Sequence, residues 1–294
     1  MQNLTHPNGS RVRKCIIPVA GFGTRFLPAT KALPKEMLPV LDKPVVQCIV
    51  EEAVASGIED IILVTGQNKR AVEDHFDFHS ELEDWLKKTK KFQQLEQIRE
   101  IAKMANFIYI RQKGPYGNGT PILNARHLIG NEPFAVLWGD EMFVSKKPRL
   151  KQLIETYEKY HDSVLCAMKI TKEETSKYGV IEGLQVEKGV LQVKNLKEKP
   201  GPDKTKSRIG SLSGYILTPE IFEHLGKTPL RNNELWLVDG IERMMKKRSV
   251  YARLVEGERY DAGSKFGWLK ANIATALQNK GMKNKLKSYL REAL

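Results

Sequence analysis

The sequence predicts an α/β protein with a mixed, mainly parallel sheet flanked by helices. Residues 15–19 and 61–64 are short apolar runs of strand length, and each leads into a glycine-containing turn. Between them, apolar residues with the spacing of one helix face follow Pro44 and stop at Gly57. A succession of strand, loop, helix and strand begins a βαβ unit, whose two strands are parallel.

The same alternation continues through the first half of the chain. Residues 69–104 are mostly polar with helically spaced large apolar side chains, which predicts a helical insertion. A helix is expected to begin at Pro121 and to stop at Gly130. The remaining elements predicted here are strands at 107–110, 134–137 and 164–168 and a helix at 150–157.

The second half has short alternating segments at 179–182, 190–197 and 213–217, which predict antiparallel strands added at the sheet edge. Helices are expected at 219–225, 237–246 and 266–276, with a strand at 250–254. We expect one domain over residues 13–277, preceded by a mobile tail (1–12) and followed by a basic helix (278–294).

The charge balance predicts an anionic partner. Lys and Arg number 48 against 35 Asp and Glu, a formal net charge of +13. Nucleic-acid binding would need a clustered basic face, whereas these residues are spread along the chain, and the runs at 87–91 and 280–287 are typical of solvated helix faces. Three widely spaced cysteines, with no apolar leader and no membrane-length run, favour a reduced, cytoplasmic protein without a membrane partner.

A glycine-rich turn follows the first strand and predicts a phosphate cradle. Gly21 and Gly23 leave backbone N–H groups open to an anion, and Arg25 and Lys35 add two cations nearby. The glycines alone would indicate only a tight turn. The dinucleotide pattern G-x-G-x-x-G fails because Phe26 stands where its third glycine would be, and no G-x-x-x-x-G-K-[ST] string occurs.

The loop resembles the signature of the sugar-nucleotide pyrophosphorylases, a family of nucleotidyltransferases. In that signature a strand runs into G-x-G-T-R-x-x-P-x-T and then P-K-E-M-L-P-V, which here occupy residues 21–30 and 34–40. The similarity extends over about 13–276 and is greatest to the bacterial members that use UTP and glucose 1-phosphate. It implies the Rossmann-like nucleotide-diphospho-sugar transferase fold with small antiparallel additions.

The resemblance implies that glucose 1-phosphate attacks the α-phosphorus of UTP, giving UDP-glucose and pyrophosphate. No covalent intermediate is needed, so the protein aligns two anions and neutralises their charge. The residues that match the family's triphosphate site are the catalytic cations Arg25 and Lys35 and the substrate-binding residues Ala20, Gly21, Gly23, Thr24 and Glu36.

Asp140 and Asp261 match the family's two aspartates that meet at Mg²⁺, an ion held by one or two carboxylates and by phosphate oxygens. Either aspartate alone would indicate a turn former. Where these enzymes have Asp-Asp, the chain has Asp140-Glu141. The resemblance therefore gives catalytic and ligand roles to Asp140, and it leaves the role of Glu141 open.

The resemblance also implies a sugar-phosphate half, 146–277, beside a nucleotide half, 13–145. Glu198-Lys199-Pro200 matches the string E-K-P, in which Lys199 would bind the sugar phosphate and Glu198 the sugar hydroxyls. Tyr178 and Gly179 match the Y-G-V string that approaches the sugar. Without the resemblance, the pair 198–199 would indicate an ion pair at a strand end.

Base recognition is implied less fully. Gln112 and Gly117 match the region that reads uracil, but Asn118-Gly119-Thr120-Pro121 replaces the family's L-G-H-A. Transfer from dTTP, CTP or GTP, or to another sugar 1-phosphate, is thus an alternative. A non-catalytic sugar-nucleotide or nucleic-acid binder is a second alternative, against which the joint presence of the catalytic set argues. We expect a homo-oligomer that binds UTP and glucose 1-phosphate and no nucleic acid.

Overall fold

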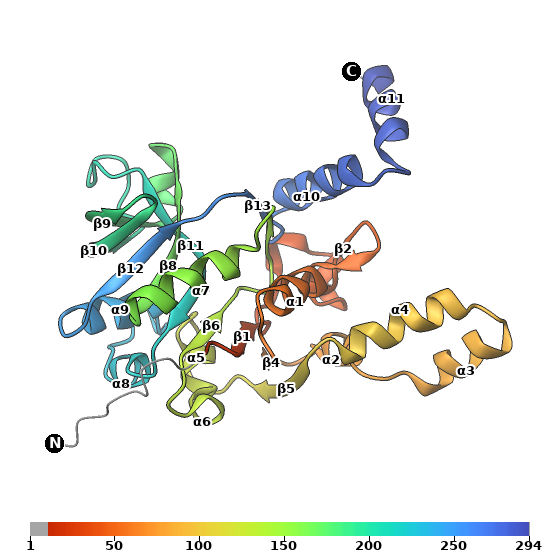
Figure 1. Ribbon diagram of the computed structural model, residues 1–294, viewed down its shortest axis with the longest axis horizontal. Coiled ribbons are helices and arrows are strands. Elements are labelled where there is room, and N and C mark those ends of the chain that lie inside the picture. Colours follow the sequence, from red (N-terminus) through yellow and green to blue (C-terminus); the bar gives the residue numbers. More distant parts are fainter. Residues whose placement is uncertain (1–10, 294) are drawn as a thin grey trace.

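A computed structural model describes residues 11–293, and its centre is a nine-stranded sheet with strand order β5-β4-β1-β6-β11-β8-β12-β10-β9 (Figure 1). The strands from the first half are parallel to one another. These strands are β1 (Lys14–Pro18), β4 (Asp60–Thr65), β5 (Asn106–Arg111) and β6 (Phe134–Val136). Those from the second half are β8 (Ser163–Lys169), β9 (Gly179–Glu187), β10 (Val190–Glu198), β11 (Ile209–Leu217) and β12 (Val250–Leu254).

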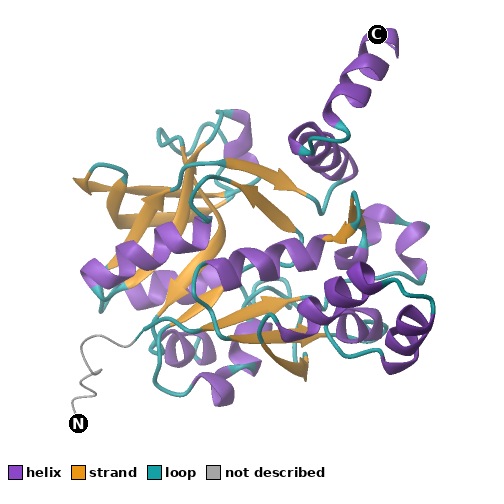
Figure 2. Ribbon diagram, turned by 45° about the vertical axis from the view of Figure 1, so that its right-hand side comes forward, coloured by secondary structure: helices purple, strands orange, loops and turns teal. Residues whose placement is uncertain are grey.

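Helices cover both faces of the sheet (Figure 2). Strand β1 shows why, since Cys15 and Ile17 point to one core and Ile16 to the other. The first core includes α1 (Val45–Ala55), α7 (Arg149–Tyr160) and α10 (Lys265–Gln278). The second includes α5 (Thr120–Asn124), α6 (Arg126–Ile129), α8 (Ile221–Gly226) and α9 (Leu237–Met245).

The predicted βαβ unit and helical insertion are confirmed. Strands β1 and β4 pair in parallel around α1, with Cys15 opposite Ile61. The insertion forms α2 (Arg70–His75), α3 (Ser80–Lys88) and α4 (Phe92–Lys103), and α3 and α4 project from one side of the molecule (Figure 1). The basic C-terminal helix is α11 (Lys283–Ala293), which stands away from the sheet.

Three details differ from the sequence predictions. Strand β11, expected at the edge, lies in the middle of the sheet, antiparallel to β6 and β8, with a register irregularity between Ser211 and Tyr215. The helix expected over 121–130 is two short helices that meet at Ala125. Two small antiparallel pairs were not anticipated: β2 (Pro39–Val40) with β3 (Lys43–Pro44), and β7 (Glu141–Val144) with β13 (Glu258–Asp261).

Residues 1–10 of the expected mobile tail lie outside the described residues, whereas Val12 is buried in the core. Among residues 11–293, no helix is long and apolar enough to cross a membrane.

Candidate active site

The glycine-rich loop begins where β1 ends, and its shape depends on glycine at position 23. Gly23 has a φ of 69° and precedes a short 3₁₀ turn at Thr24–Phe26. A Cβ at this position would lie 3.0 Å from the Cβ of Lys35, and the Thr30 hydroxyl donates to the Gly23 carbonyl at 2.7 Å. The loop therefore packs closely against the segment that carries Lys35.

The pair of strands β7 and β13 brings the two predicted aspartates to the same place. Asp261, the last residue of β13, is opposite Glu141, and Asp140 directly precedes β7. The Lys35 amine lies 2.5 Å from Asp140 Oδ2, and an Arg25 guanidinium nitrogen lies 3.9 Å from Asp261 Oδ2. Residues separated by more than a hundred positions thus form one cluster of two cations and two carboxylates.

The charge state of Lys35 follows from this cluster. Burial lowers the pKa of the Lys35 amine, but the Asp140 and Glu36 carboxylates outweigh burial, so its pKa lies above the ordinary value. The amine is a fixed positive charge at neutral pH, as a group that neutralises a triphosphate must be.

The space beside Gly263 shows that the carboxylates of Asp140 and Asp261 lie close together. A Cβ on Gly263 would lie 2.5 Å from Asp140 Oδ2 and 3.1 Å from Asp261 Oδ1. Two carboxylate oxygens near one point are a donor set that suits a hard divalent cation whose other ligands are water and phosphate oxygens. Among residues 11–293 there is no group of three or more His, Cys, Asp or Glu side chains that could hold a metal. Asp140 and Asp261 are the candidate protein ligands because their carboxylate oxygens lie near one point.

A cavity of about 500 Å³ opens beside this cluster and gathers most of the predicted nucleotide-side residues. Its lining includes Ala20, Gly21, Lys35, Glu36, Gln112 and Gly117, together with Phe22, Tyr116, Asn118, Pro121, Trp138 and Glu234. A second cavity of about 330 Å³ includes Ala20, Gly21 and Thr24 in its lining. The loop of residues 20–24 thus separates two cavities, which the sequence did not indicate.

Glu36 lies in this lining, but its carboxylate already has a partner. It is 2.7 Å from the Lys69 amine, and both side chains are buried. Burial raises the pKa of the Glu36 carboxyl, and the Lys69 charge opposes that effect. The pair ties the start of α2 to the loop, so Glu36 also has a structural role that the motif did not reveal.

The segment that departs from the family pattern packs on the loop before α9. The Asn118 side-chain oxygen accepts from the Leu237 N–H at 2.8 Å, and the Gly119 N–H donates to the Leu235 carbonyl. A Cβ on Gly117, whose φ is 109°, would lie 2.2 Å from that carbonyl oxygen. Asn118 therefore satisfies a helix N-terminus, and Gly117 is required by close backbone approach.

The predicted sugar-side residues lie together at one end of β9 and β10. Gly179 pairs with Glu198 in the ladder, and a Cβ on Gly179 would lie 3.2 Å from Glu198 Oε2. The Lys199 N–H donates to the Tyr178 carbonyl at 3.2 Å. The Lys199 amine is 3.5 Å from Glu198 Oε1 and 5.4 Å from the centre of the Trp236 ring. This part of the predicted site is thus a single group of neighbouring residues.

The open question of Glu141 is answered by its contacts. Its carboxylate accepts from the Ser213 N–H at 3.1 Å and lies within 3.3 Å of Arg149 and 2.6 Å of Arg259. The Glu141 carboxylate therefore faces the buried Arg149 and the partly buried Arg259 and is not grouped with Asp140 and Asp261. Sequence reasoning missed Arg149 and Arg259, because nothing in their local sequence distinguishes them from surface arginines.

The sequence matches a known protein family and curated relatives over most of its length. Residues 14–276 match the nucleotidyl transferase family. The chain is 47% identical to the UTP–glucose-1-phosphate uridylyltransferase YngB of Bacillus subtilis, over 97% of this chain and 96% of that protein. It is also 47% identical to a UTP–glucose-1-phosphate uridylyltransferase of Staphylococcus epidermidis, over 96% and 98%.

Solved structures give the same result. A UDP-glucose pyrophosphorylase complexed with UDP-glucose is 42% identical with a TM-score of 0.82, covering 91% of this chain and all of that one. The UTP-bound UGPase from Acinetobacter baumannii is 33% identical with a TM-score of 0.89, covering 96% and 99%. The fold prediction is confirmed, and the chain belongs to the nucleotidyl transferase family.

Proposed function

We propose that this protein transfers a uridylyl group from UTP to glucose 1-phosphate, giving UDP-glucose and pyrophosphate. The observation that carries the proposal is the cluster in which Lys35 meets Asp140 and Arg25 meets Asp261, beside a cavity of about 500 Å³. Relatives named for this activity match almost the whole chain.

Within this proposal, each group of residues has one task. Arg25, Lys35 and the backbone of residues 20–24 bind the triphosphate, and fixed cations there stabilise charge on the leaving pyrophosphate. Gln112 and Gly117 contact the base. Asp140 and Asp261 hold Mg²⁺, which when bound would neutralise charge on the α-phosphate.

Lys199 binds the sugar phosphate and Glu198 accepts from sugar hydroxyls, while Tyr178 and Gly179 shape that side. The exposed Lys199 amine lies close enough to Glu198 for both to face one ligand. We retain the division into a nucleotide half, 13–145, and a sugar-phosphate half, 146–277, as part of this proposal, with Asp261 contributed to the nucleotide side by the second half.

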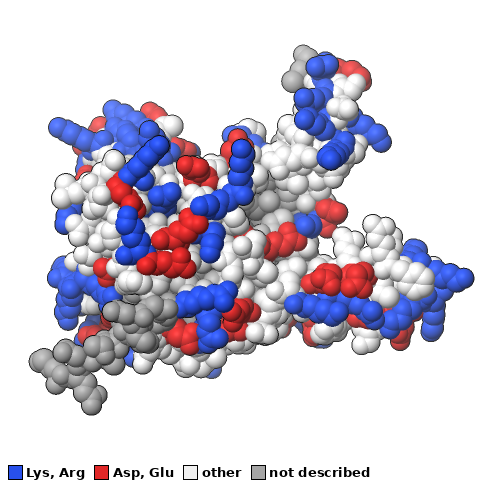
Figure 3. All heavy atoms as spheres, viewed as in Figure 1, with Lys and Arg blue, Asp and Glu red and all other residues white. Residues whose placement is uncertain are grey.

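A role as a nucleic-acid binder has less support. On the face shown in Figure 3, Lys and Arg residues are interspersed with Asp and Glu and do not form one basic stripe. The net charge of +13 would attract a nucleoside triphosphate and a sugar phosphate as well as it would attract nucleic acid.

We also propose a cytoplasmic location and a homo-oligomeric state. Cys15, Cys48 and Cys166 are all unpaired thiols, as expected in a reducing compartment. On the projecting α3–α4 arm, Trp85 is 50% exposed and Phe92 is 62% exposed. Exposed aromatic side chains of this kind suit contact with a second copy of the chain.

The proposal is tested by incubating the protein with Mg²⁺, glucose 1-phosphate and one of UTP, dTTP, CTP or GTP, and following pyrophosphate release. We expect UTP to give the highest kcat/KM. The Lys35→Ala variant is the control, because it removes the cation beside Asp140 and should lose most turnover. A clear preference for another base would overturn the uridylyl assignment, and no release with any triphosphate would overturn the proposed reaction.

A further inference from the structure

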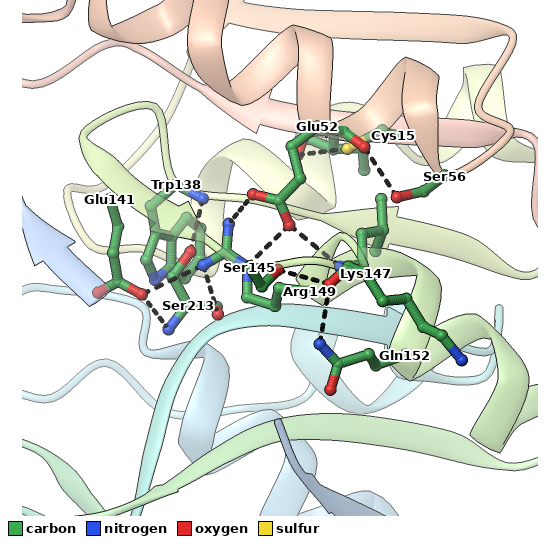
Figure 4. Close-up of polar contacts among 12 residues, drawn as sticks. Cys15, Glu52, Ser56, Trp138, Glu141, Ser145, Lys147, Arg149, Gln152 and Ser213 are labelled. Carbon is green, nitrogen blue, oxygen red and sulfur yellow. Dashed lines mark hydrogen bonds and ion pairs between the residues drawn. The ribbon is translucent and has the colours of Figure 1, made fainter. Parts of the chain in front are cut away.

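A line of charged side chains lies beside the candidate active site, and Figure 4 shows its part from Glu52 through Arg149 to Glu141. It begins in α1 with Glu52, whose carboxylate accepts from Arg149 Nε at 3.1 Å and Nη2 at 2.9 Å. Arg149, in α7, is completely buried, and its Nη1 lies 3.3 Å from Glu141 Oε1. The other Glu141 oxygen lies 2.6 Å from Arg259 Nη2. Negative and positive side chains alternate, so each charge has an opposite neighbour.

The line ends on the sugar side of the site. Arg259 Nη1 donates to the Tyr178 hydroxyl at 2.7 Å, and the guanidinium carbon lies 4.7 Å from the centre of the Tyr178 ring. Tyr178 thus has a hydrogen bond and a cation–π contact to one arginine. The Tyr178 carbonyl also accepts from the Lys199 N–H. By holding Tyr178, Arg259 therefore also constrains the backbone that carries Lys199.

Arg259 also belongs to the strand that supplies a candidate metal ligand. It lies two residues before Asp261 in β13, so the two side chains share a face of the strand. Strand β13 pairs with β7, where Glu141 directly follows Asp140. Arg259 is therefore joined to the aspartate side through its own strand and through Glu141, and to the sugar side through Tyr178.

The contacts of Arg259 are with the side chains of Glu141 and Tyr178. Its side chain is 17% exposed, its Nη2 is directed at Glu141, its Nη1 at Tyr178, and its Nε is buried. A planar fork that is always charged can hold a carboxylate and a hydroxyl at a fixed separation, which a lysine amine does not do.

We infer that Arg259 is a positioning residue for the proposed uridylyl transfer, on which this inference rests. It holds Tyr178, and with it the Lys199 backbone, at a fixed place relative to the strand that carries Asp261. Glu141 is the anchor that orients Arg259, and Arg149 and Glu52 hold Glu141 in turn. The sugar phosphate is thereby aligned with the triphosphate by a side chain that touches neither substrate.

The Arg259→Lys variant tests this inference, because it keeps a positive charge beside Glu141 while losing the fork. We expect the KM for glucose 1-phosphate to rise about tenfold. We expect UTP affinity, measured by calorimetry without sugar phosphate, to change less than twofold. The control is Arg253→Lys in β12, whose guanidinium donates to the Lys188 carbonyl away from the candidate site residues, and this change should leave both values unchanged. An Arg259→Lys protein that is folded and has an unchanged KM for glucose 1-phosphate would overturn the inference.

A double-mutant cycle separates positioning from general weakening of the fold. Tyr178→Phe removes the hydroxyl that accepts from Arg259, and we expect the combined variant to raise KM no further than the larger single change. If the two effects multiply in full, Arg259 does not act through Tyr178 and the inference is wrong. If Arg259→Lys fails to fold, Tyr178→Phe decides alone, and an unchanged KM in that variant is contrary to the inference.

Turnover by the wild-type protein distinguishes failure of this inference from failure of the proposed uridylyl transfer. An inactive wild type refutes the proposed function, whereas an active wild type with unaffected variants refutes the positioning role of Arg259 alone.

Discussion

The two sides of the candidate site hold their lysines in different ways. On the nucleotide side, Lys35 is 17% exposed and lies 2.5 Å from Asp140, a carboxylate supplied by a distant part of the chain. On the sugar side, Lys199 is 48% exposed, and its nearest carboxylate belongs to its own neighbour, Glu198, at 3.5 Å. One cation is fixed by the tertiary fold, and the other extends from a strand end over the Trp236 ring.

This difference indicates what each lysine can contribute. An exposed ion pair adds little to stability, whereas removing one partner of a buried pair leaves an uncompensated charge. Changes near Lys35 should therefore affect turnover and stability together. Changes at Lys199 should affect contacts with substrate and leave stability nearly unchanged.

The largest effect is expected from the two aspartates. Asp140→Asn and Asp261→Asn each remove one candidate ligand charge at nearly constant size, and turnover should fall about 100-fold or more, as for loss of a central electrostatic contact. Asp140→Asn should also lower the melting temperature, because Lys35 loses its partner, while Asp261→Asn should lower it less.

The measurement is steady-state pyrophosphate release at several Mg²⁺ concentrations, with thermal unfolding of each variant. Asp42→Asn, at an exposed position, is the matched control and should behave as the wild type. Excess Mg²⁺ should restore little. Near-normal turnover in either aspartate variant would show that its carboxylate is not a ligand.

An intermediate effect is expected from Lys199→Ala. A charge-assisted contact is worth roughly 1.5–3 kcal/mol, so kcat/KM for glucose 1-phosphate should fall about tenfold to a hundredfold. The melting temperature and the affinity for UTP alone should change little. Arg25→Ala should show the opposite bias and weaken UTP binding first.

Calorimetry with UTP in the absence of sugar phosphate distinguishes the two variants. Equal loss of UTP affinity in Lys199→Ala and Arg25→Ala would mean that the nucleotide and sugar sides are not separate at these residues.

Sequence reasoning reached the parts of this molecule in which local pattern and structure agree. Short apolar runs predicted β1 and β4, because strands buried on both faces are continuously apolar. The motif strings selected Lys35, Asp140 and Lys199, since matching a whole string restricts a residue's environment far more than its own identity does.

What sequence did not predict depends on contacts between distant segments. The pair of β7 and β13 was missed because four residues at 258–261 carry no alternation that a pattern could detect, yet this pair brings Asp261 to Asp140. From its sequence, Arg149 would be expected on the surface at the start of a helix. It is instead completely buried, and its charge is balanced by Glu52 and Glu141, which belong to other elements. Such pairing appears only in three dimensions.

The smallest effect is expected at Asn118, which lines the cavity and also departs from the family pattern. Its side-chain oxygen accepts from Leu237 N–H, the first residue of α9, an end at which N–H groups lack partners within the helix. Asn118→Ala should therefore cost about 1 kcal/mol, as loss of a cap does, and lower the melting temperature by about 2–4 °C. The ratio of UTP to dTTP turnover should stay within twofold of the wild type. Asn118→Asp keeps an acceptor oxygen and should retain the wild-type melting temperature. If Asn118→Ala changes the base preference and leaves the melting temperature unaltered, Asn118 contacts the base and does not cap α9. The nucleotide side would then include a side chain that, unlike Lys35, is not held in place by a contact within the fold.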